Sequence, residues 1–277
     1  MPETTQADMK PQEVTAGLGH LGSRLRSYFL FDPLIWLYTI VLGCASLIIS
    51  LFDPTGERQQ NIARLWSQMI LWTIGASVQV EGLDKIDTSK PQVYVVNHLS
   101  ALDIPVLYTH LPFQFRILAK KELFRYPFMG WHLRRPGQIP VVLENPKASV
   151  RSLNLAVAAI RKGNSLVIFP EGGRSPDGQL HTFMGGAFYA AVKAQVDVVP
   201  IVLVGTYEML KMNSFHIKPG SVQMVVGSPI STVGMSTRDI AKITERARIV
   251  MGDLYYSRCL VPDLRGEQPA SNESIKL

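Results

Sequence analysis

About twenty consecutive residues, from Pro33 to Phe52, carry no charged side chain. As an α-helix rising about 1.5 Å per residue, this stretch is about 30 Å long, which matches the hydrocarbon thickness of a bilayer. Trp36 and Tyr38 lie near one end, where amphipathic aromatic rings favour the membrane interface. We therefore expect a membrane-embedded helix here. The alternative is a helix buried in the core of a soluble domain.

The residues before this run are of two kinds. Residues 1–18 are largely polar, and we expect them to be disordered. Residues 19–31 mix leucines and aromatic residues with Arg24 and Arg26, which predicts a short amphipathic stretch at a membrane surface. No cleavable signal peptide is expected, because the long apolar run begins too far from the N-terminus.

A break and a second apolar segment follow the run. Asp53-Pro54-Thr55-Gly56 is rich in turn formers, so the first helix should end there. Residues 60–76 are apolar, but Arg64 and Gln68 interrupt them and the segment is short for a span. We expect an interfacial or re-entrant helix rather than a second crossing. Basic residues lie on both sides of the first run, so they do not fix its orientation.

The chain of 277 residues has a formal net charge of +6 and is 47% apolar. A basic surplus suits nucleic acid, an anionic membrane surface or a phosphate-bearing substrate. No Lys/Arg run is interleaved with aromatic residues, so we expect no nucleic-acid partner. The two cysteines, Cys44 and Cys259, show neither a disulfide framework nor a metal-site spacing, which favours a reducing compartment.

From about Val78, short β-rich runs alternate with helical patterns, which is typical of an α/β fold. We expect strands at 92–96, 165–169, 196–204 and 222–226, and helices at 103–111, 148–162, 183–194 and 236–255. The expected architecture is a mixed sheet flanked by helices, with an N-terminal membrane-associated helical segment. Its parts are a polar and amphipathic segment (1–32), membrane-anchoring helices (33–77), the α/β domain (78–255) and a C-terminal tail (256–277).

The strand expected at 92–96 ends at the turn Asn97-His98, and Asp103 lies five residues after His98. If a helix starts between them, the carboxylate lies about one turn from the imidazole and can approach it. A carboxylate on one ring nitrogen fixes the tautomer and leaves the other nitrogen free to take a proton. We therefore expect a general base with its orienting carboxylate, against the alternative of a structural histidine. The other histidines show no ligand spacing, so we expect no metal site.

The sequence Phe-Pro-Glu-Gly-Gly-Arg-Ser, from Phe169 to Ser175, follows another expected strand. Gly172 and Gly173 let the backbone approach a ligand closely, and Arg174 offers a planar donor fork for phosphate. The alternative is an ordinary turn with a surface ion pair between Glu171 and Arg174. There is no Gly-x-Ser-x-Gly elbow, so a covalent acyl-enzyme is not indicated.

The His-x4-Asp pair, followed at this distance by the Phe169–Ser175 sequence, resembles the glycerolipid (lysophospholipid) acyltransferase family. The resemblance covers roughly residues 60–230 and includes Lys120-Lys121-Glu122-Leu123. It implies a membrane-bound enzyme that transfers a fatty acyl group from acyl-CoA or acyl carrier protein to the hydroxyl of a lyso-glycerolipid such as lysophosphatidate. No cofactor is implied beyond that thioester co-substrate. In a bacterium, we expect an inner-membrane location with the catalytic domain facing the cytoplasm.

The resemblance also assigns roles to individual residues. His98 is implied as the general base and Asp103 as its orienting partner. The residues implied in substrate binding are Asn97, Ser100, Lys120, Glu171, Gly172, Gly173 and Arg174. Direct transfer is the simplest route, in which His98 takes the proton of the acceptor hydroxyl as that oxygen attacks the thioester carbonyl.

Three positions depart from the family pattern. Gly173 stands where threonine is common, Leu143 where an arginine is usual, and Met184 where a lysine is usual. The last two remove cations that would help to hold an acceptor phosphate. These departures leave open another lyso-lipid acceptor, such as an aminoacyl lyso-lipid, and a lipid-binding homologue with weakened catalysis. A transacylase that uses a phospholipid donor is a further alternative, and a hydrolase is a weaker one.

Overall fold

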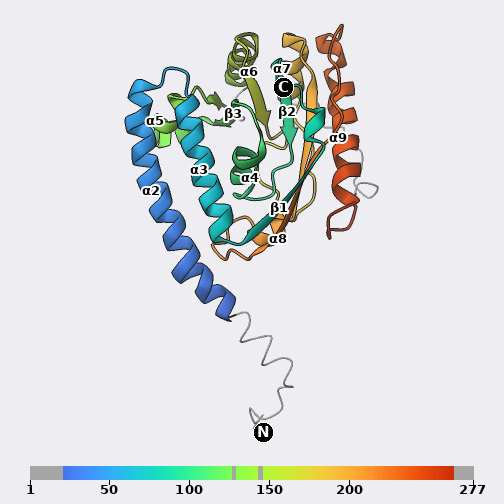
Figure 1. Ribbon diagram of the computed structural model, residues 1–277. Coiled ribbons are helices and arrows are strands. Elements are labelled where there is room, and N and C mark those ends of the chain that lie inside the picture. Colours follow the sequence, from blue (N-terminus) through green and yellow to red (C-terminus); the bar gives the residue numbers. More distant parts are fainter. Residues whose placement is uncertain (1–20, 127–128, 143–145, 265–277) are drawn as a thin grey trace, which may run out of the picture.

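The computed structural model describes residues 21–126, 129–142 and 146–264, and its centre is one seven-stranded sheet (Figure 1). The strands are β1 (Ala76–Glu81), β2 (Val93–Val96), β3 (Phe115–Lys120), β4 (Ile139–Val141), β5 (Ser165–Ile168), β6 (Val198–Val204) and β7 (Gly220–Val226). They lie in the order β1-β7-β6-β2-β5-β3-β4. All neighbouring strands are parallel except β6 and β7, so the expected mixed sheet is confirmed.

The three central strands fix where the sheet presents its chemistry. Every residue of β2, β5 and β6 is buried, as expected for strands that are covered on both faces. Val93 pairs with Leu166 on one side and with Val198 on the other. The residues that follow Val96 and Ile168 therefore leave the same edge of the sheet as neighbours. The carboxyl ends of parallel strands are where such sheets place ligand sites.

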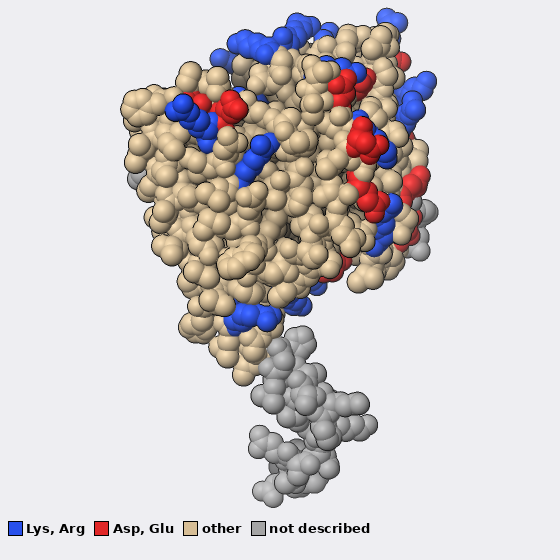
Figure 2. Space-filling model, viewed as in Figure 1, with Lys and Arg blue, Asp and Glu red and all other residues tan. Residues whose placement is uncertain are grey.

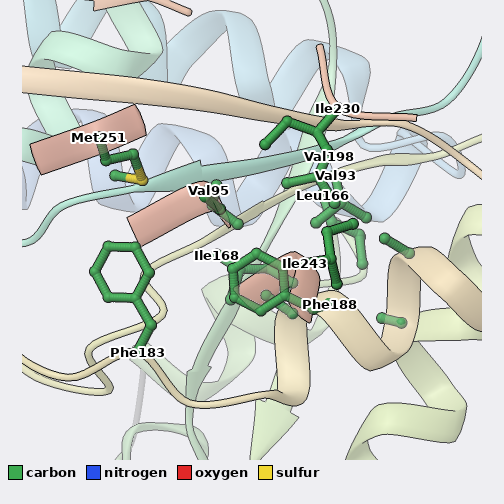
Figure 3. Packing of buried hydrophobic residues seen from close by; sticks show 14 of the residues in the cluster. Val93, Val95, Leu166, Ile168, Phe183, Phe188, Val198, Ile230, Ile243 and Met251 are labelled. Atoms are coloured by element: carbon green, nitrogen blue, oxygen red, sulfur yellow. The ribbon is translucent and has the colours of Figure 1, made fainter. Parts of the chain in front are cut away.

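Helices cover both faces of the sheet. One face is covered by α6 (Pro146–Arg161), α7 (Gly186–Ala194) and α9 (Ile240–Tyr256), and the other by α3 (Glu57–Thr73) and α4 (Asp103–His110). Val95 and Ile168 pack towards α7 and α9, in the core that Figure 3 shows. Tyr94 and Val167 point to the opposite face because side chains alternate along a strand.

In the described part of the chain, one helix is long and apolar enough to cross a membrane. It runs from Leu21 to Phe52 and contains a π-helical turn (Ser27–Phe31) followed by α2 (Asp32–Ile49). The π-helical turn ends two residues before Pro33, which has no N–H to donate to the preceding turn. Only 11% of the most apolar window is buried, so this is not the core helix of the alternative interpretation.

The second apolar segment forms α3, which packs beside α2 and leads into the edge strand β1 (Figure 1). Figure 2 shows few charged side chains over these two helices, whereas acidic and basic side chains gather along α9. Exposed apolar side chains on this surface include Trp36 (62% exposed), Phe52 (73%) and Trp72 (81%). The molecule therefore has one broad apolar face at its N-terminal helices.

The expected helices and strands of the α/β domain are all present, with their ends shifted by a few residues. The sequence pattern did not indicate β1, β3 and β4, nor the short helix α5 (Met129–Arg134). The expected disorder of residues 1–18, the end of the C-terminal tail and the departure at Leu143 lie outside the described residues.

Candidate active site

His98 lies in the turn between β2 and α4, at the carboxyl edge of the sheet. Its Nδ1 is 2.8 Å from Oδ2 of Asp103, so the expected contact between the two side chains is present. The ring stacks on Phe169, with ring centroids 4.0 Å apart and planes tilted by 23°. Among the described residues, no group hydrogen-bonds Nε2 of His98. The ring is thus held on one side and presents one nitrogen that is available for proton transfer.

Asp103 is fully buried, and three donors converge on a single oxygen of its carboxylate. Oδ2 accepts hydrogen bonds from Nδ1 of His98 (2.8 Å) and from the main-chain N–H groups of Leu99 (2.7 Å) and Ser100 (2.9 Å). An ionised carboxylate can only accept, so Nδ1 must carry the hydrogen. The neutral ring then has its lone pair on Nε2, which is the tautomer of a general base. The first-turn position in α4 favours the negative charge.

Glu171 ties the second motif to His98 through main-chain groups. Its Oε1 accepts from the N–H of His98 and its Oε2 from the N–H of His181, both at 2.9 Å. Burial raises the pKa of Glu171 to about 7, and the nearby carboxylates of Asp103 and Asp177 act in the same direction. The two N–H donors oppose this shift in pKa because they favour the charged form. Glu171 therefore braces the histidine turn.

The carbonyl of His98 is held as well. It accepts a hydrogen bond of 2.7 Å from the N–H of Ser175, at the end of the same motif. Between these two anchors, Gly172 has φ +73°, a left-handed conformation that favours glycine. Among the described residues, no ion pair joins Glu171 to Arg174. The structure therefore does not show the surface ion pair of the alternative interpretation.

The cationic candidates lie on the same edge of the sheet, and among the described residues neither forms a hydrogen bond with His98. Arg174 is exposed and follows the two glycines of the turn. Lys120 is exposed at the end of β3, the strand that pairs with β5. Their positions suit an anionic group that approaches from solvent. Substrate binding by Lys120, Arg174 and the glycines remains a prediction.

In this structure the side chains of Asn97 and Ser100 hydrogen-bond to the main chain, and their expected role in substrate binding remains a prediction. The side-chain amide of Asn97 donates to the carbonyl of Leu203 (2.8 Å) and accepts from the N–H of the same residue (2.7 Å). The hydroxyl of Ser100 donates to the carbonyl of Leu210 (2.7 Å). Both side chains are fully buried. They fasten the His98 turn to β6 and to the segment that follows it.

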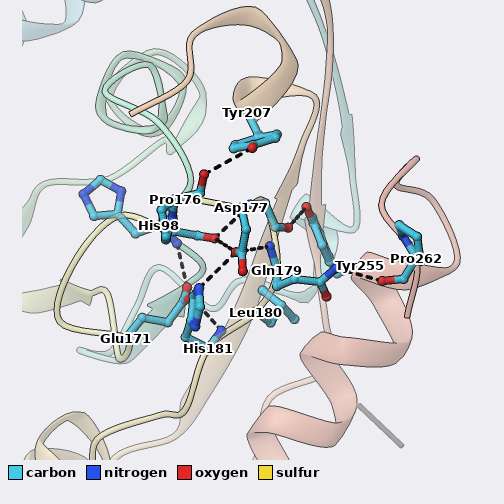
Figure 4. A network of polar contacts seen from close by, with 12 residues as sticks. His98, Glu171, Pro176, Asp177, Gln179, Leu180, His181, Tyr207, Tyr255 and Pro262 are labelled. Carbon is cyan, nitrogen blue, oxygen red and sulfur yellow. Dashed lines mark hydrogen bonds and ion pairs between the residues drawn. The ribbon is translucent and has the colours of Figure 1, made fainter. Parts of the chain in front are cut away.

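The sequence did not indicate a polar network that surrounds this edge (Figure 4). It joins the loop from Ser175 to His181 with the end of α9, where Tyr255 donates to the carbonyl of Gly178 (2.6 Å). Backbone acceptors leave no pattern in a sequence, although Pro176-Asp177-Gly178, with Gly178 at φ +81°, is a turn sequence that could have marked the loop. The described residues contain no cluster of three or more His, Cys, Asp or Glu side chains that could hold a metal.

Comparisons with known proteins show the family to which this chain is similar. The acyltransferase family model matches residues 77–204. A chloroplastic 1-acyl-sn-glycerol-3-phosphate acyltransferase of Arabidopsis thaliana is 34% identical over 76% of this chain and 60% of its own length. A Pseudomonas aeruginosa protein of the same description is 30% identical over 79% of this chain and 86% of its own.

Among solved structures, the 1-acyl-sn-glycerophosphate acyltransferase of Thermotoga maritima shares this fold. The TM-score is 0.69 with 23% sequence identity, and the match covers 85% of this chain and 98% of that one. This chain spans about three fifths of the length of the Arabidopsis relative. The Pseudomonas relative, by contrast, is covered over most of its length. The chain belongs to the acyltransferase family.

Proposed function

We propose that the chain is a membrane-bound O-acyltransferase that moves a fatty acyl group from an acyl thioester to the hydroxyl of a lyso-glycerolipid. The observation that carries the proposal is the His98–Asp103 pair, whose hydrogen bond of 2.8 Å leaves Nε2 as the base. The relatives are described as 1-acyl-sn-glycerol-3-phosphate acyltransferases, which favours lysophosphatidate as the acceptor. The donor is acyl-CoA or acyl carrier protein.

The proposed reaction needs one proton relay. Nε2 of His98 takes the proton of the acceptor hydroxyl while that oxygen attacks the thioester carbonyl. Asp103 stabilises the imidazolium that forms. When the tetrahedral intermediate collapses, the C–S bond breaks and the thiolate takes the proton from Nε2, which gives the ester and a free thiol. General-base catalysis of this kind contributes about 10²- to 10⁴-fold.

The acceptor phosphate has two cations within its proposed reach, Lys120 and Arg174, on the edge of the sheet where His98 lies. Met184, which stands at a usual lysine position, is close to the motif because its N–H donates to the carbonyl of Pro170 (2.8 Å). The loss of that lysine weakens the hold on a phosphate. An acceptor with another head group is therefore included in the assay below, although the relatives' descriptions favour lysophosphatidate.

We propose that the helix from Leu21 to Phe52, together with α3, holds the α/β domain on the membrane. Large apolar side chains are exposed along this surface, and such a patch marks a contact site in a soluble domain. Ile40 lies within the span and is 61% exposed. We place the α/β domain on the cytoplasmic side, where a reducing environment suits the free thiol of Cys259.

The test of the reaction is acyl transfer by the purified full chain in detergent. Radiolabelled acyl-CoA is offered with lysophosphatidate, with other lyso-lipids and with no acceptor, and the products are separated. His98→Ala is expected to abolish the ester product. His110→Ala is the matched control, because its ring hydrogen-bonds the carbonyl of Val106 in its own helix (3.0 Å) and lies outside the proposed site.

Each outcome of this assay is decisive. An ester of lysophosphatidate that depends on His98 supports the proposal in full. An ester formed only from another lyso-lipid indicates that the acceptor is not lysophosphatidate. Label released as free fatty acid in the absence of an acceptor indicates a hydrolase. Product that forms from a labelled phospholipid, with no dependence on thioester, indicates a transacylase. Transfer at the wild-type rate by His98→Ala would refute the mechanism.

The membrane proposal is tested by flotation of the protein with lipid vesicles. Ile40→Lys places a charge in the span, at a cost of about 3 kcal/mol at the centre of a bilayer. Ile249→Lys makes the same change at an exposed position of α9. We expect only the first variant to lose flotation. Equal flotation of both variants would contradict anchoring by this helix.

A further inference from the structure

We propose that α9 positions the catalytic histidine, and that Tyr256 is the residue through which it acts. The inference rests on the proposed function, because it concerns the placement of the His98 base. α9 follows residues 77–204, which the family model matches, so it lies outside that stretch. The proposal therefore adds a positioning residue that the shared motifs do not contain.

The end of α9 holds three consecutive residues of the loop that follows the Glu171 motif. The hydroxyl of Tyr256 donates to Oε1 of Gln179 (2.8 Å) and accepts from the N–H of Leu180 (3.1 Å). The hydroxyl of Tyr255 donates to the carbonyl of Gly178 (2.6 Å). Figure 4 shows Gln179 and Leu180 between His98 on one side and Tyr255 on the other.

One route from this loop reaches the N–H of His98. His181 follows Leu180 directly, and its N–H donates to Oε2 of Glu171 (2.9 Å). Oε1 of Glu171 accepts from the N–H of His98 at the same distance. Tyr256 therefore holds Leu180, and Leu180 directly precedes His181, whose N–H bonds Glu171.

A second route reaches the carbonyl of His98. Gly178, which Tyr255 holds, donates its N–H to the hydroxyl of Ser175 (3.0 Å). The N–H of Ser175 donates to the carbonyl of His98 (2.7 Å). Both main-chain groups of His98 are thus connected to the end of α9 by short runs of hydrogen bonds.

The segment that follows α9 also holds the loop. Nε2 of Gln179 donates to the carbonyl of Pro262 (2.9 Å), in the segment after α9. Leu180 is 5% exposed and packs in the same core as Tyr255. The bonds of Tyr256 are partly buried, so solvent only partly replaces a bond lost on the tyrosine side. The loop then relaxes, and the position of His98 relative to the attacking hydroxyl becomes less defined.

The decisive variant is Tyr256→Phe, which removes one oxygen and retains the ring. A small misplacement of a base lowers turnover more than it lowers substrate binding, so we expect kcat to fall roughly tenfold with KM for the acceptor unchanged. Gln179→Ala removes the other partner of the Tyr256 hydroxyl, and the same split between kcat and KM is expected.

The matched control is Tyr94→Phe. The hydroxyl of Tyr94 also donates to Oε1 of a glutamine, Gln92, at 2.8 Å, but it lies near the opposite end of β2. Tyr94→Phe removes one hydrogen bond of the same length and kind as the bond from Tyr256 to Gln179. The lost bond has no connection to the loop from Gly178 to His181. We expect a comparable loss in urea-unfolding stability and an unchanged kcat.

A second measurement does not need turnover. Hydrogen–deuterium exchange of the full chain should become faster in Tyr256→Phe for peptides that contain His98 and His181, and unchanged there in Tyr94→Phe. An equal fall of kcat in both variants, or no change of kcat and exchange in Tyr256→Phe, would overturn the proposal. If wild-type protein transfers no acyl group, the proposed function fails, and the exchange result alone decides whether α9 braces His98.

Discussion

Replacing Asp103 by asparagine separates two roles of this carboxylate, which are to orient the His98 ring by a hydrogen bond and to stabilise the imidazolium by its charge. The main-chain N–H groups of Leu99 and Ser100 both point at Oδ2, at 2.7 and 2.9 Å. An amide NH2 group cannot sit there, so the asparagine oxygen must take the place of Oδ2. It still accepts from Nδ1 of His98, and the ring keeps its tautomer and orientation. At the contact with His98, the change therefore removes the negative charge and keeps the hydrogen bond.

The size of the effect follows from this geometry. At an effective dielectric constant of about 20, opposite charges about 4 Å apart attract by about 4 kcal/mol, which sets the upper limit of what Asp103 contributes to the imidazolium. Each 1.36 kcal/mol is tenfold in rate, so we expect Asp103→Asn to lower kcat by about 10²- to 10³-fold. Its NH2 group replaces Oδ1, which has no partner in the described structure, at a cost of about 1–3 kcal/mol in stability.

Asp103→Ala is the informative comparison. It leaves the buried N–H groups of Leu99 and Ser100 unpaired, so we expect a loss of about 2–6 kcal/mol in unfolding free energy. Both variants are measured by acyl transfer at saturating substrates and by urea unfolding. A rate for Asp103→Asn within threefold of wild type would show that the charge is not used. Inactivity as complete as that of His98→Ala would show that the tautomer is not held by the backbone.

Two further predictions concern Glu171 and a glycine. The pKa of Glu171 is raised to about 7, and protonation removes one of its two acceptor oxygens, so activity should fall as the pH drops through about 7. Folding stability should change in the opposite direction and rise as the pH falls from 7 towards 4.5, because the folded state then binds more protons than the unfolded state. Glu171→Gln should have low activity at every pH and should lose this pH dependence of stability. Gly205→Ala should lower the urea midpoint strongly, since φ is +99° and a Cβ would lie 2.1 Å from the carbonyl oxygen of Ser221. Gly234→Ala, with φ +76° and open space around it, is its control and should cost about 1–2 kcal/mol.

The sequence predicted the parts of the fold whose signals are periodic and local. The buried strands β2, β5 and β6 are uninterrupted apolar runs, and α6 is ended by Gly163 at φ +88°. β3 escaped prediction because a charged residue, Arg116, is its second residue. That side chain is 8% exposed and donates to the carbonyl of Thr55 (2.9 Å), a partner that no local pattern indicates.

The site divides in the same way. The contact between His98 and Asp103 follows from one turn of local chain, so the spacing predicted it. The roles of Asn97 and Ser100 depend on carbonyls that lie more than a hundred residues away in sequence, and the family motif suggested substrate contact instead. The N-terminal helix is longer than its charge-free run because a π-helical turn accommodates Pro33, and Asp32 lies inside the helix.

The pairing of the first strand with the last has a consequence for biosynthesis. β1 directly follows α3, yet among the described strands its neighbour in the sheet is β7, and Ala76 pairs with Gly220. While the chain emerges from a ribosome, the helices α2 and α3 are complete long before the edge strand can find its partner. If these helices enter lipid first, the sheet is completed beside the bilayer, and the ends of the domain close last. Shortening the chain before β7 should therefore leave an inserted anchor with an open, unpaired sheet edge.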